Sequence, residues 1–377
     1  MAVTFDCIVL GLGGVGSATL AALARRGVRV LGIDRFSPPH ERGSSHGDTR
    51  TIRRAYYEHP DYIPLVESAF RNWRELEAET GRSLLTRREL FLAGPSEGEA
   101  ISGTLESARL HDLDIAEIPR REVELRFPHF RIHPDDTFVH ERDAGFLRVE
   151  ACIQAHLDVA SKQGAETRCD EPVVEWSADG RGVRVRTARN EYAADRVVVT
   201  AGAWAALILR DLDVSLHVRR KVLTWHGVGQ EHRDAFRGGP IYLFDRPAGV
   251  FYGFPALGDD SIKVGEHTGG CDVPDPTDID RELHPGDIQP IAEFLNDCLY
   301  GVDPVPLRHT VCMYTMTPDG NFIVDRHPNH PNVAIAAGLS GHGFKFAPVL
   351  ASALADLSLE GESALPIDFL KFSRFSG

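Results

Sequence analysis

The first 34 residues constrain the fold of this 377-residue chain more than any other stretch. An apolar run over residues 7–10 ends at Gly11, and the pattern Gly11-Leu-Gly-Gly-Val-Gly16 leads into an Ala- and Leu-rich amphipathic segment. A second apolar run, residues 28–33, ends on Asp34. This order of strand, glycine loop, helix, strand and acid is typical of a dinucleotide-binding βαβ unit. An ordinary βαβ unit with a glycine-rich turn is the alternative, and the segment alone does not distinguish FAD from NAD.

Each position in this pattern has a physical role in such a unit. Gly11 permits a tight turn, Gly13 lets the backbone approach a pyrophosphate, and Gly16 lets the helix pack closely on the strand. The helix N-terminus presents free N–H groups and the positive end of its dipole to the phosphates. Asp34 can then accept hydrogen bonds from a ribose.

Composition narrows the class of protein and its partners. The chain is 42% hydrophobic and 25% charged, as in ordinary globular proteins, and it is long enough for two cores. Its formal net charge of −14 disfavours nucleic acid or an anionic membrane as the main partner. No stretch is apolar enough to span a bilayer, and residues 1–6 lead straight into the first apolar run, leaving no room for a signal peptide. The six cysteines are scattered without metal-type spacing, so neither a disulfide framework nor a zinc site is predicted, and we expect a cytoplasmic protein.

Residues 35–53 form a long segment with prolines, glycines and small polar residues, so we expect a loop. Arg50, Arg53 and Arg54 concentrate positive charge there in an otherwise acidic chain. Either this is a solvated basic loop, or it covers the cofactor and supplies a cation to the substrate.

The rest of the chain alternates helical and extended patterns. Helices are predicted at 62–80, 98–110, 149–163, 278–299 and 348–359, and strands within 84–92, 167–174, 182–187, 304–316 and 332–337. Residues 121–130 read as a connecting segment, and the period-2 pattern over 217–267 predicts an antiparallel sheet. Because the nucleotide-binding pattern returns in three separated pieces, we expect interleaved domains.

Two further strand-to-glycine turns support this organisation. The apolar run 196–203 stops at Gly202 and is followed by Trp204, which suits a turn that touches the nucleotide from its other side. The run 332–337 leads into the glycine-rich segment 338–345 and then a helix. Several N–H groups at such a turn suit an anion or the electron-rich edge of an isoalloxazine.

Five motifs follow one another from residue 11 to residue 346. They are GLGGVG, GSSHGDTRTIRRAY, YGFP followed by IKVGEH, VCMYTMTPDGNFIVD, and AGLSGHGFKF. Together they resemble the monomeric sarcosine oxidase family and its relatives, the N-methyl amino acid oxidases among the glycine-oxidase and D-amino-acid-oxidase flavoproteins. The resemblance covers nearly the whole chain. It implies an α/β fold in which a Rossmann-like FAD-binding domain (1–82, 143–215, 318–377) is interleaved with a catalytic domain on a mainly antiparallel sheet (83–142, 216–317).

The resemblance also implies how the flavin is held. Cys312 matches the cysteine that attaches to the flavin 8α-methyl carbon through a thioether, whereas sequence alone suggests an ordinary strand cysteine. His46, Thr49 and Arg50 match loop residues near the flavin ring. The remaining predicted FAD contacts are Gly11, Gly13, Gly14, Val15, Gly16, Asp34, Arg35, Ser44, Val174, Ala201, Gly202, Trp204, Met313, Gly338, Gly341, Gly343, Phe344 and Lys345.

The resemblance also implies which residues bind the substrate and promote the reaction with oxygen. Lys263 matches a lysine that promotes the reaction of the flavin with oxygen, although a strand lysine is usually solvated. Arg53 and Lys345 match a pair of cations that binds the substrate carboxylate, and otherwise each reads as a surface cation. Three residues match the lining of the substrate pocket, with core packing as the alternative: Tyr252, His267 and Tyr314. The predicted catalytic residues are therefore Lys263, Arg50, His46, Thr49, His267 and Tyr314.

The implied reaction is oxidation of sarcosine or a similar N-methyl amino acid by FAD and oxygen, giving glycine, formaldehyde and hydrogen peroxide from sarcosine. A monomer is implied as well. Met316 and Glu266 depart from the lysine and tyrosine of the family pattern, which leaves the substrate open. The alternatives are an oxidase for a bulkier or cyclic amino acid such as N-methyltryptophan or pipecolate, a flavin dehydrogenase that uses an electron carrier, and a non-catalytic nucleotide-binding protein.

Overall fold

The structure is a computed structural model that describes residues 3–375. Residues 1–2 and 376–377, which the predicted domain boundaries include, lie outside the described residues. The amino-terminal βαβ unit forms as expected, with β1 (Val3–Leu10) parallel to β2 (Val30–Ile33) and α1 (Gly14–Arg25) between them. Its strands are apolar on both sides because they are covered on both faces.

Parallel strands from distant parts of the chain extend this unit into a sheet. The parallel order is β20 (His330–Ala337), β12 (Glu191–Val199), β1, β2 and β9 (Glu166–Arg168). Three antiparallel strands complete an eight-stranded sheet: β10 (Val173–Ala178), β11 (Val183–Thr187) and β19 (Ile323–His327). One face carries a helical layer made of α1, α2 (Tyr62–Thr80), α5 (Val149–Lys162) and α9 (Ala347–Leu359).

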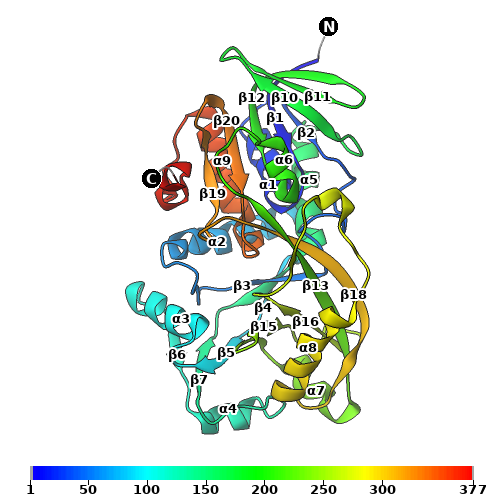
Figure 1. Cartoon of the computed structure of the whole chain (residues 1–377). Coiled ribbons are helices and arrows are strands. Elements are labelled where there is room, and N and C mark those ends of the chain that lie inside the picture. The colour runs from blue at the N-terminus through cyan, green and yellow to red at the C-terminus, as the bar shows by residue number, and fades with distance from the viewer. Residues whose placement is uncertain (1–2, 376–377) are drawn as a thin grey trace.

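A nine-stranded sheet forms the other half of the molecule (Figure 1). Its strands are β5 (Leu90–Pro95), β6 (Ile115–Glu117), β7 (Asp136–Glu141), β13 (His217–Val228), β14 (Ile241–Arg246), β15 (Gly249–Gly253), β16 (Ser261–Glu266), β17 (Cys271–Asp272) and β18 (Val302–Met316). Apart from the parallel pair β5 and β14, the neighbours are antiparallel. The expected fold class, α/β with a second, mainly antiparallel sheet, is confirmed.

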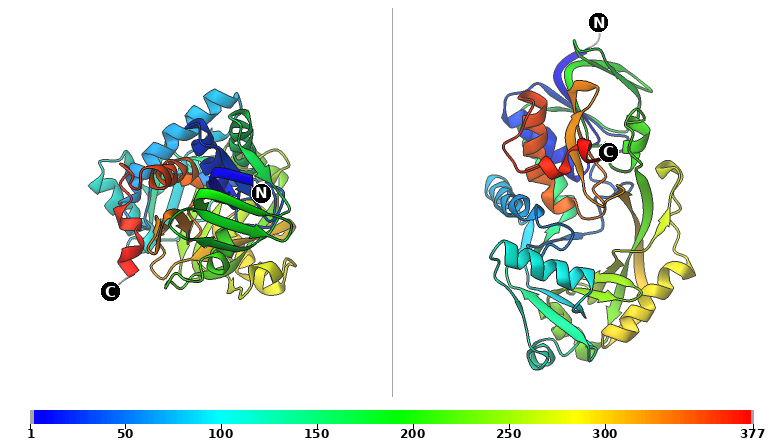
Figure 2. Two further views of the ribbon diagram at one scale, coloured as in Figure 1. Left: turned by 90° about the horizontal axis from the view of Figure 1, so that it is seen from above. Right: turned by 60° about the vertical axis from the view of Figure 1, so that its left-hand side comes forward.

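Helices cover both faces of the nine-stranded sheet. In β5, Leu90 and Leu92 pack in a core with α3 (Glu99–Leu110), whereas Phe91 and Ala93 pack in a core with α8 (Pro285–Cys298). Because successive strand side chains point to opposite faces, α3 and α8 lie on opposite sides, as the right-hand view of Figure 2 shows. Short helices α4 (Arg120–Arg126) and α7 (Arg233–Gly238) complete this half.

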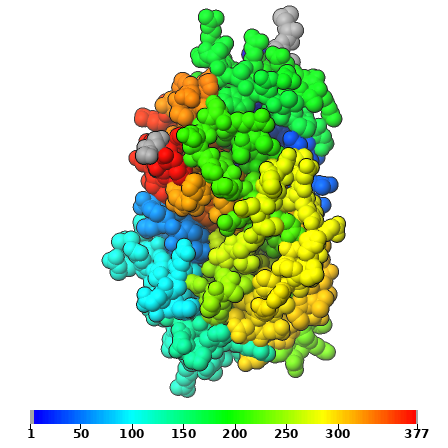
Figure 3. All heavy atoms as spheres, in the orientation of Figure 1, coloured from blue at the N-terminus to red at the C-terminus, as the bar shows by residue number. Residues whose placement is uncertain are grey.

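Two long strands join the halves. β13 and β18 pair from His217 opposite Met316 to Val228 opposite Val302, and they run from the upper to the lower half of Figure 1. In the space-filling view, segments from the start, middle and end of the chain meet in the upper half (Figure 3). The predicted domain boundaries stay a prediction.

Several local predictions were wrong. Residues 121–130 include α4, and the expected strand 167–174 is two strands, β9 and β10, separated by Asp170 at φ 53° and by Pro172. The expected loop 35–53 ends in β3 (Thr49–Ile52), which pairs with β8 (Gly145–Arg148) beside β4 (Leu85–Arg87). The helix expected to begin at 278 begins at Pro285. The expected strand 196–203 ends at Val199.

Within residues 3–375 no helix combines the length and the apolar character that crossing a membrane requires. All six cysteines are free thiols.

Candidate active site

A cavity of about 430 Å³ lies at the carboxyl ends of the parallel strands, the edge at which open α/β sheets bind ligands. Its walls come from the segments that follow these strands: Gly11 after β1, Asp34 after β2, Ala201 after β12 and Gly338 after β20. Separate stretches of sequence thus converge on one elongated space.

The glycine loop is shaped by close backbone contacts. Gly11 has φ +92°, and a β-carbon there would lie 2.6 Å from the Thr200 carbonyl oxygen. A β-carbon on Gly16 would lie 1.7 Å from the Gly11 carbonyl oxygen, so only glycine lets α1 approach β1 so closely. The N-cap residue of α1 is Gly13, which has no side chain, and the Gly14 N–H donates to Ser45 Oγ (3.2 Å). These groups form a cradle that fits a pyrophosphate.

Asp34 fixes the shape of this loop. Its carboxylate accepts hydrogen bonds from the backbone N–H of Leu12 (2.6 Å) and of Phe36 (2.8 Å). The side chain is buried yet lines the cavity, where its remaining lone pairs can accept hydrogen bonds from ribose hydroxyls.

Most of the predicted FAD contacts surround this cavity. Those that line it are Gly11, Gly13, Gly14, Val15, Asp34, Arg35, Ser44, Arg50, Val174, Ala201, Gly202, Trp204, Met313, Gly338, Gly341, Gly343 and Phe344. Those that do not line it are Gly16, His46, Thr49, Cys312 and Lys345. Gly16 acts instead through helix packing.

Cys312 is buried in β18 beside the lining residue Met313. Its thiol donates to the Ser44 carbonyl oxygen (3.3 Å), and Arg50 Nη2 lies 3.5 Å from Sγ. Arg50 also donates to the carbonyl oxygens of Ser44 (2.8 Å) and Thr49 (2.9 Å). The Arg50 guanidinium therefore links the loop before β3 to β18, the strand that carries Cys312.

Lys263 is a buried lysine in β16. Its Nζ donates to the carbonyl oxygens of Gly47 (2.6 Å) and Thr49 (2.8 Å) and lies over the rings of Trp225 and Phe254. Burial, followed by the charge of Arg50, lowers its pKa well below the usual value.

Two predicted histidines are neutral at pH 7. Burial lowers the pKa of His46 and of His267 to about 3 in each case. His46 Nε2 is buried and has no hydrogen-bond partner among the described residues, and His46 lines neither cavity.

A second cavity, of about 80 Å³, adjoins the first. Arg50, Tyr314, Gly341 and Phe344 line both cavities. All the predicted substrate-pocket residues line the second one, namely Arg53, Tyr252, His267, Tyr314 and Lys345.

Arg53 is paired with a carboxylate in this second cavity. Its Nη2 lies 2.8 and 2.9 Å from the two carboxylate oxygens of Glu58, and both side chains are largely buried. Burial alone would raise the pKa of Glu58, but Arg53, His342 and Lys345 lower it to about 2. Lys345 donates to the His342 carbonyl oxygen (2.9 Å), and burial followed by the charge of Arg53 lowers its pKa to about 7.

Several residues that line the two cavities were not predicted from the sequence. Glu58, Tyr57 and His342 line the second cavity, and Ser45, Phe36 and Ile208 line the first. Ser45 and His342 lie inside the quoted motifs GSSHGDTRTIRRAY and AGLSGHGFKF, which could have indicated them. No motif in the sequence indicated Glu58, because its pairing with Arg53 is set by the packing of the folded chain. The glycine cradle and the adjoining small cavity together fit FAD with a small molecule beside it.

The family described as DAO, FAD dependent oxidoreductase, matches residues 6–357. The chain therefore belongs to this family of FAD-dependent oxidoreductases. Among curated proteins, it is 40% identical over 375 residues to a monomeric sarcosine oxidase of Streptomyces avermitilis, covering 97% of each chain. It is 34% identical to an N-methyl-L-tryptophan oxidase of Salmonella agona, covering 99% of each chain. The family resemblance is confirmed.

Solved structures agree in fold. The open form of NikD, an unusual amino acid oxidase essential for nikkomycin biosynthesis, superposes with a TM-score of 0.86 at 25% identity and covers 98% of this chain and 97% of its own. Glycine oxidase from Geobacillus kaustophilus gives a TM-score of 0.83 at 18% identity, covering 99% of this chain and all of its own (100%).

Proposed function

We propose that this protein is an oxidase of small N-methyl amino acids such as sarcosine, with oxygen as the electron acceptor and formaldehyde, glycine and hydrogen peroxide as products. The observation that carries the proposal is the pair of buried cations, Arg53 and Lys345, in a small cavity that shares its wall with the FAD cavity. Curated relatives named as sarcosine and N-methyltryptophan oxidases support the same class of substrate.

The two cations define how the substrate is oriented. The Arg53 guanidinium, whose Nη2 is paired with Glu58, can offer its remaining N–H donors to a substrate carboxylate, and the Lys345 ammonium adds a point charge. A carboxylate held there leaves the N-methyl amine toward the wall formed by Arg50, Tyr314, Gly341 and Phe344. When bound, FAD supplies the two-electron oxidation of the C–N bond.

The amine reacts only in its neutral form, since a protonated nitrogen has no lone pair. His267 lines the same cavity and is a neutral imidazole at pH 7, so it can accept a hydrogen bond from the substrate nitrogen. Tyr252, Tyr314 and Phe254 surround the space with aromatic surface, which lowers the local dielectric constant and strengthens the ion pair to the carboxylate.

The size of the cavity favours a small substrate. Its volume of about 80 Å³ is far below the roughly 300–1,000 Å³ of pockets for drug-sized ligands. An indole side chain fits only if the lining residues move, so N-methyltryptophan is the second candidate.

We also propose that Cys312 holds the FAD covalently through a thioether to its 8α-methyl carbon. Contacts with Ser44 and Arg50 orient the thiol next to the cavity wall. The wild-type protein should stay yellow after acid denaturation, and intact-mass measurement should show one added FAD. Cys312→Ala should release all of its flavin under acid, and acid-released flavin from the fully matured wild type would contradict the attachment.

Lys263 is proposed to promote the oxygen reaction, because a buried cation stabilises the negative charge that develops on reduced oxygen. The negative net charge and the six free thiols are in keeping with a cytoplasmic protein, and we propose a monomer.

The decisive experiment compares four substrates on the purified holoenzyme by peroxide release: sarcosine, N-methyl-L-tryptophan, pipecolate and dimethylamine. Sarcosine should give the highest kcat/KM, and dimethylamine should react poorly because it lacks the carboxylate. A preference for N-methyltryptophan would favour the second candidate. Equal rates with dimethylamine would contradict the carboxylate anchor, and flavin reduction without peroxide would favour a dehydrogenase.

A further inference from the structure

Two clusters of metal-ligating side chains lie outside both cavities of the active site. One is His133, Asp297 and Cys298, and the other is Asp211, His327 and His330. In each cluster three potential ligand atoms lie within 4.8 Å of one another. Their geometry and hydrogen bonds differ in ways that decide which can hold an ion.

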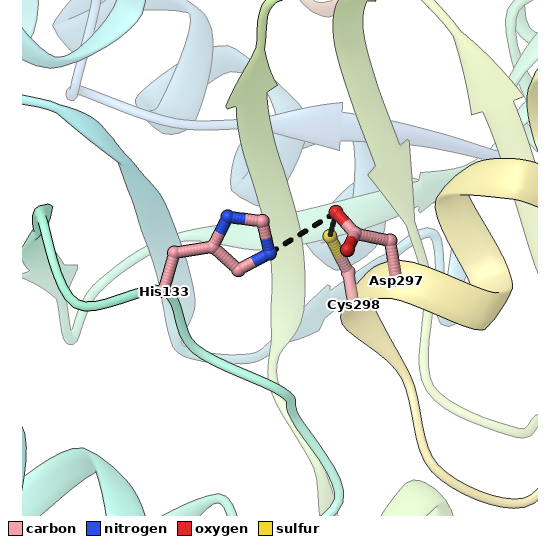
Figure 4. A group of neighbouring side chains, drawn as sticks. All are labelled: His133, Asp297 and Cys298. Atoms are coloured by element: carbon pink, nitrogen blue, oxygen red, sulfur yellow. Dashed lines mark hydrogen bonds and ion pairs between the residues drawn. The ribbon is translucent and has the colours of Figure 1, made fainter.

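The side chains of the first cluster lie close together, with Asp297 in contact with both His133 and Cys298 (Figure 4). Asp297 Oδ2 lies 3.1 Å from His133 Nε2 and 3.7 Å from Cys298 Sγ. In a tetrahedral zinc site with Zn–S of about 2.3 Å and Zn–N and Zn–O of about 2.0 Å, nitrogen and oxygen lie about 3.3 Å apart and sulfur and oxygen about 3.5 Å apart. The two distances from Asp297 Oδ2 are thus close to those of a tetrahedral zinc site, and the His133 nitrogen and the Cys298 sulfur lie within 4.8 Å of each other.

A buried ion pair positions two of the three ligands. Arg246 Nε donates to Cys298 Sγ (3.3 Å), and its two terminal nitrogens bind the carboxylate of Asp136 (2.7 and 2.9 Å). Asp136 Oδ2 also accepts the backbone N–H of His133 (2.9 Å). One network therefore fixes both the sulfur and the loop that carries the imidazole, as the groups behind metal ligands commonly do.

The charges of the cluster balance a divalent cation. A metal ion that binds Cys298 displaces the proton of its thiol into solvent; the resulting thiolate and the Asp297 carboxylate then together carry −2, and the adjoining Arg246 and Asp136 cancel one another. Asp297 and Cys298 are the last residues of α8, where the negative end of the helix dipole favours a cation. A thiolate, an imidazole and a carboxylate are a donor set suited to zinc.

The second cluster is less suited to bind a metal ion. His327 Nδ1 accepts the backbone N–H of Asn329 (3.2 Å), so the neutral ring carries its proton on Nε2, which faces Asp211 Oδ2 at 3.0 Å. An ion on Nε2 would require that proton on Nδ1, directed at the Asn329 N–H. His133 has no such restriction, because no hydrogen bond engages its Nδ1 among the described residues and its side chain is 41% exposed.

We propose that His133, Asp297 and Cys298 form a zinc site that joins the loop before β7 to the carboxyl end of α8. Water completes the coordination, because the His133 and Asp297 side chains face solvent while the sulfur is buried. The site lies outside both cavities of the active site, and the ion would link two segments that flank the nine-stranded sheet.

The test is zinc binding by the chelator-treated holoenzyme, followed by isothermal titration calorimetry. One equivalent of Zn²⁺ should bind, and His133→Gln and Asp297→Asn should each weaken the affinity by at least about tenfold. Both side chains are partly exposed, so these variants should fold, and an unchanged Tm of the metal-free protein checks this. Two controls should bind zinc like the wild type: His330→Gln in the second cluster and Cys271→Ser at an exposed thiol.

X-ray absorption of the zinc-loaded protein provides an independent readout. It should show one sulfur at about 2.3 Å and nitrogen or oxygen at about 2.0–2.1 Å. Cys298→Ser should remove the sulfur signal. Absence of zinc binding, retention of full affinity in His133→Gln, loss of affinity in His330→Gln, or a zinc environment without sulfur would each overturn the proposal.

Discussion

Lys345 should make carboxylate binding depend on pH. Its pKa in the folded protein is about 7, whereas that of an ordinary lysine is 10.5, because burial and Arg53 disfavour the ammonium. The ammonium is therefore mostly present at pH 6 and nearly absent at pH 9. A hydrogen bond to a charged partner contributes about 1.5–3 kcal/mol, so the Kd of a carboxylate should rise about ten- to a hundredfold over this range.

The assay is a titration of the flavin absorbance with (methylthio)acetate, which offers a carboxylate but no amine that titrates. Lys345→Met should bind weakly with little pH dependence, and Lys345→Arg should bind with little pH dependence because arginine stays charged. A wild-type Kd that does not change between pH 6 and 9, or a Lys345→Met profile that matches the wild type, would refute the reasoning.

The same pKa has a consequence for stability. Between pH 7 and 10.5 the unfolded chain binds more protons at this lysine than the folded chain, so its contribution to the free energy of unfolding rises with pH. Below pH 7 the full penalty is about 5 kcal/mol for a difference of 3.5 pKa units. Lys345→Met removes this penalty, so it should raise the Tm more at pH 6 than at pH 10, as scanning calorimetry can measure.

Three further predictions follow from buried contacts. Lys263→Met should leave flavin reduction by substrate largely intact and slow reoxidation about a hundredfold or more in stopped-flow experiments; an unchanged oxidative rate would remove it from the mechanism. Gly16→Ala should lower the ratio of flavin to protein, since its β-carbon would meet the Gly11 carbonyl at 1.7 Å, whereas Gly286→Ala, in open space, should not. Glu58→Gln should lower the Tm, because Arg53 loses its buried partner at a cost of about 3–5 kcal/mol, and bound (methylthio)acetate should restore part of the loss; an unchanged Tm would show that the pair is energetically neutral.

The cofactor side of the molecule could be predicted from sequence because its signals are local. The turn at Gly11, the helix after Gly13 and the acid at Asp34 depend on neighbours within one βαβ unit. Their cavity follows from the rule that parallel strands present their carboxyl ends at one edge.

The other features of the fold and of the site depend on residues that are far apart in the sequence. β3 forms only because it pairs with β8, about a hundred residues later. The pairing of Arg53 with Glu58 depends on how the chain turns after β3. The helix α4 carries mostly charged residues with only Val123 buried, so its periodicity was too weak to reveal it. The zinc cluster brings together residues from separate elements, which is why ligand spacing in the sequence did not indicate it.

The strand order of the eight-stranded sheet has a consequence for biosynthesis. β1 leaves the ribosome before its neighbour β12, which pairs on the other side with β20, and β20 ends at residue 337. The wall that contains Gly338, Gly341 and Phe344 follows later still. The FAD cavity therefore cannot close until residue 344 has been translated, so nascent chains expose the apolar strands of an unfinished sheet. Cofactor loading is thus a late event, and chains truncated before residue 337 should be substrates for chaperones and proteases rather than for FAD.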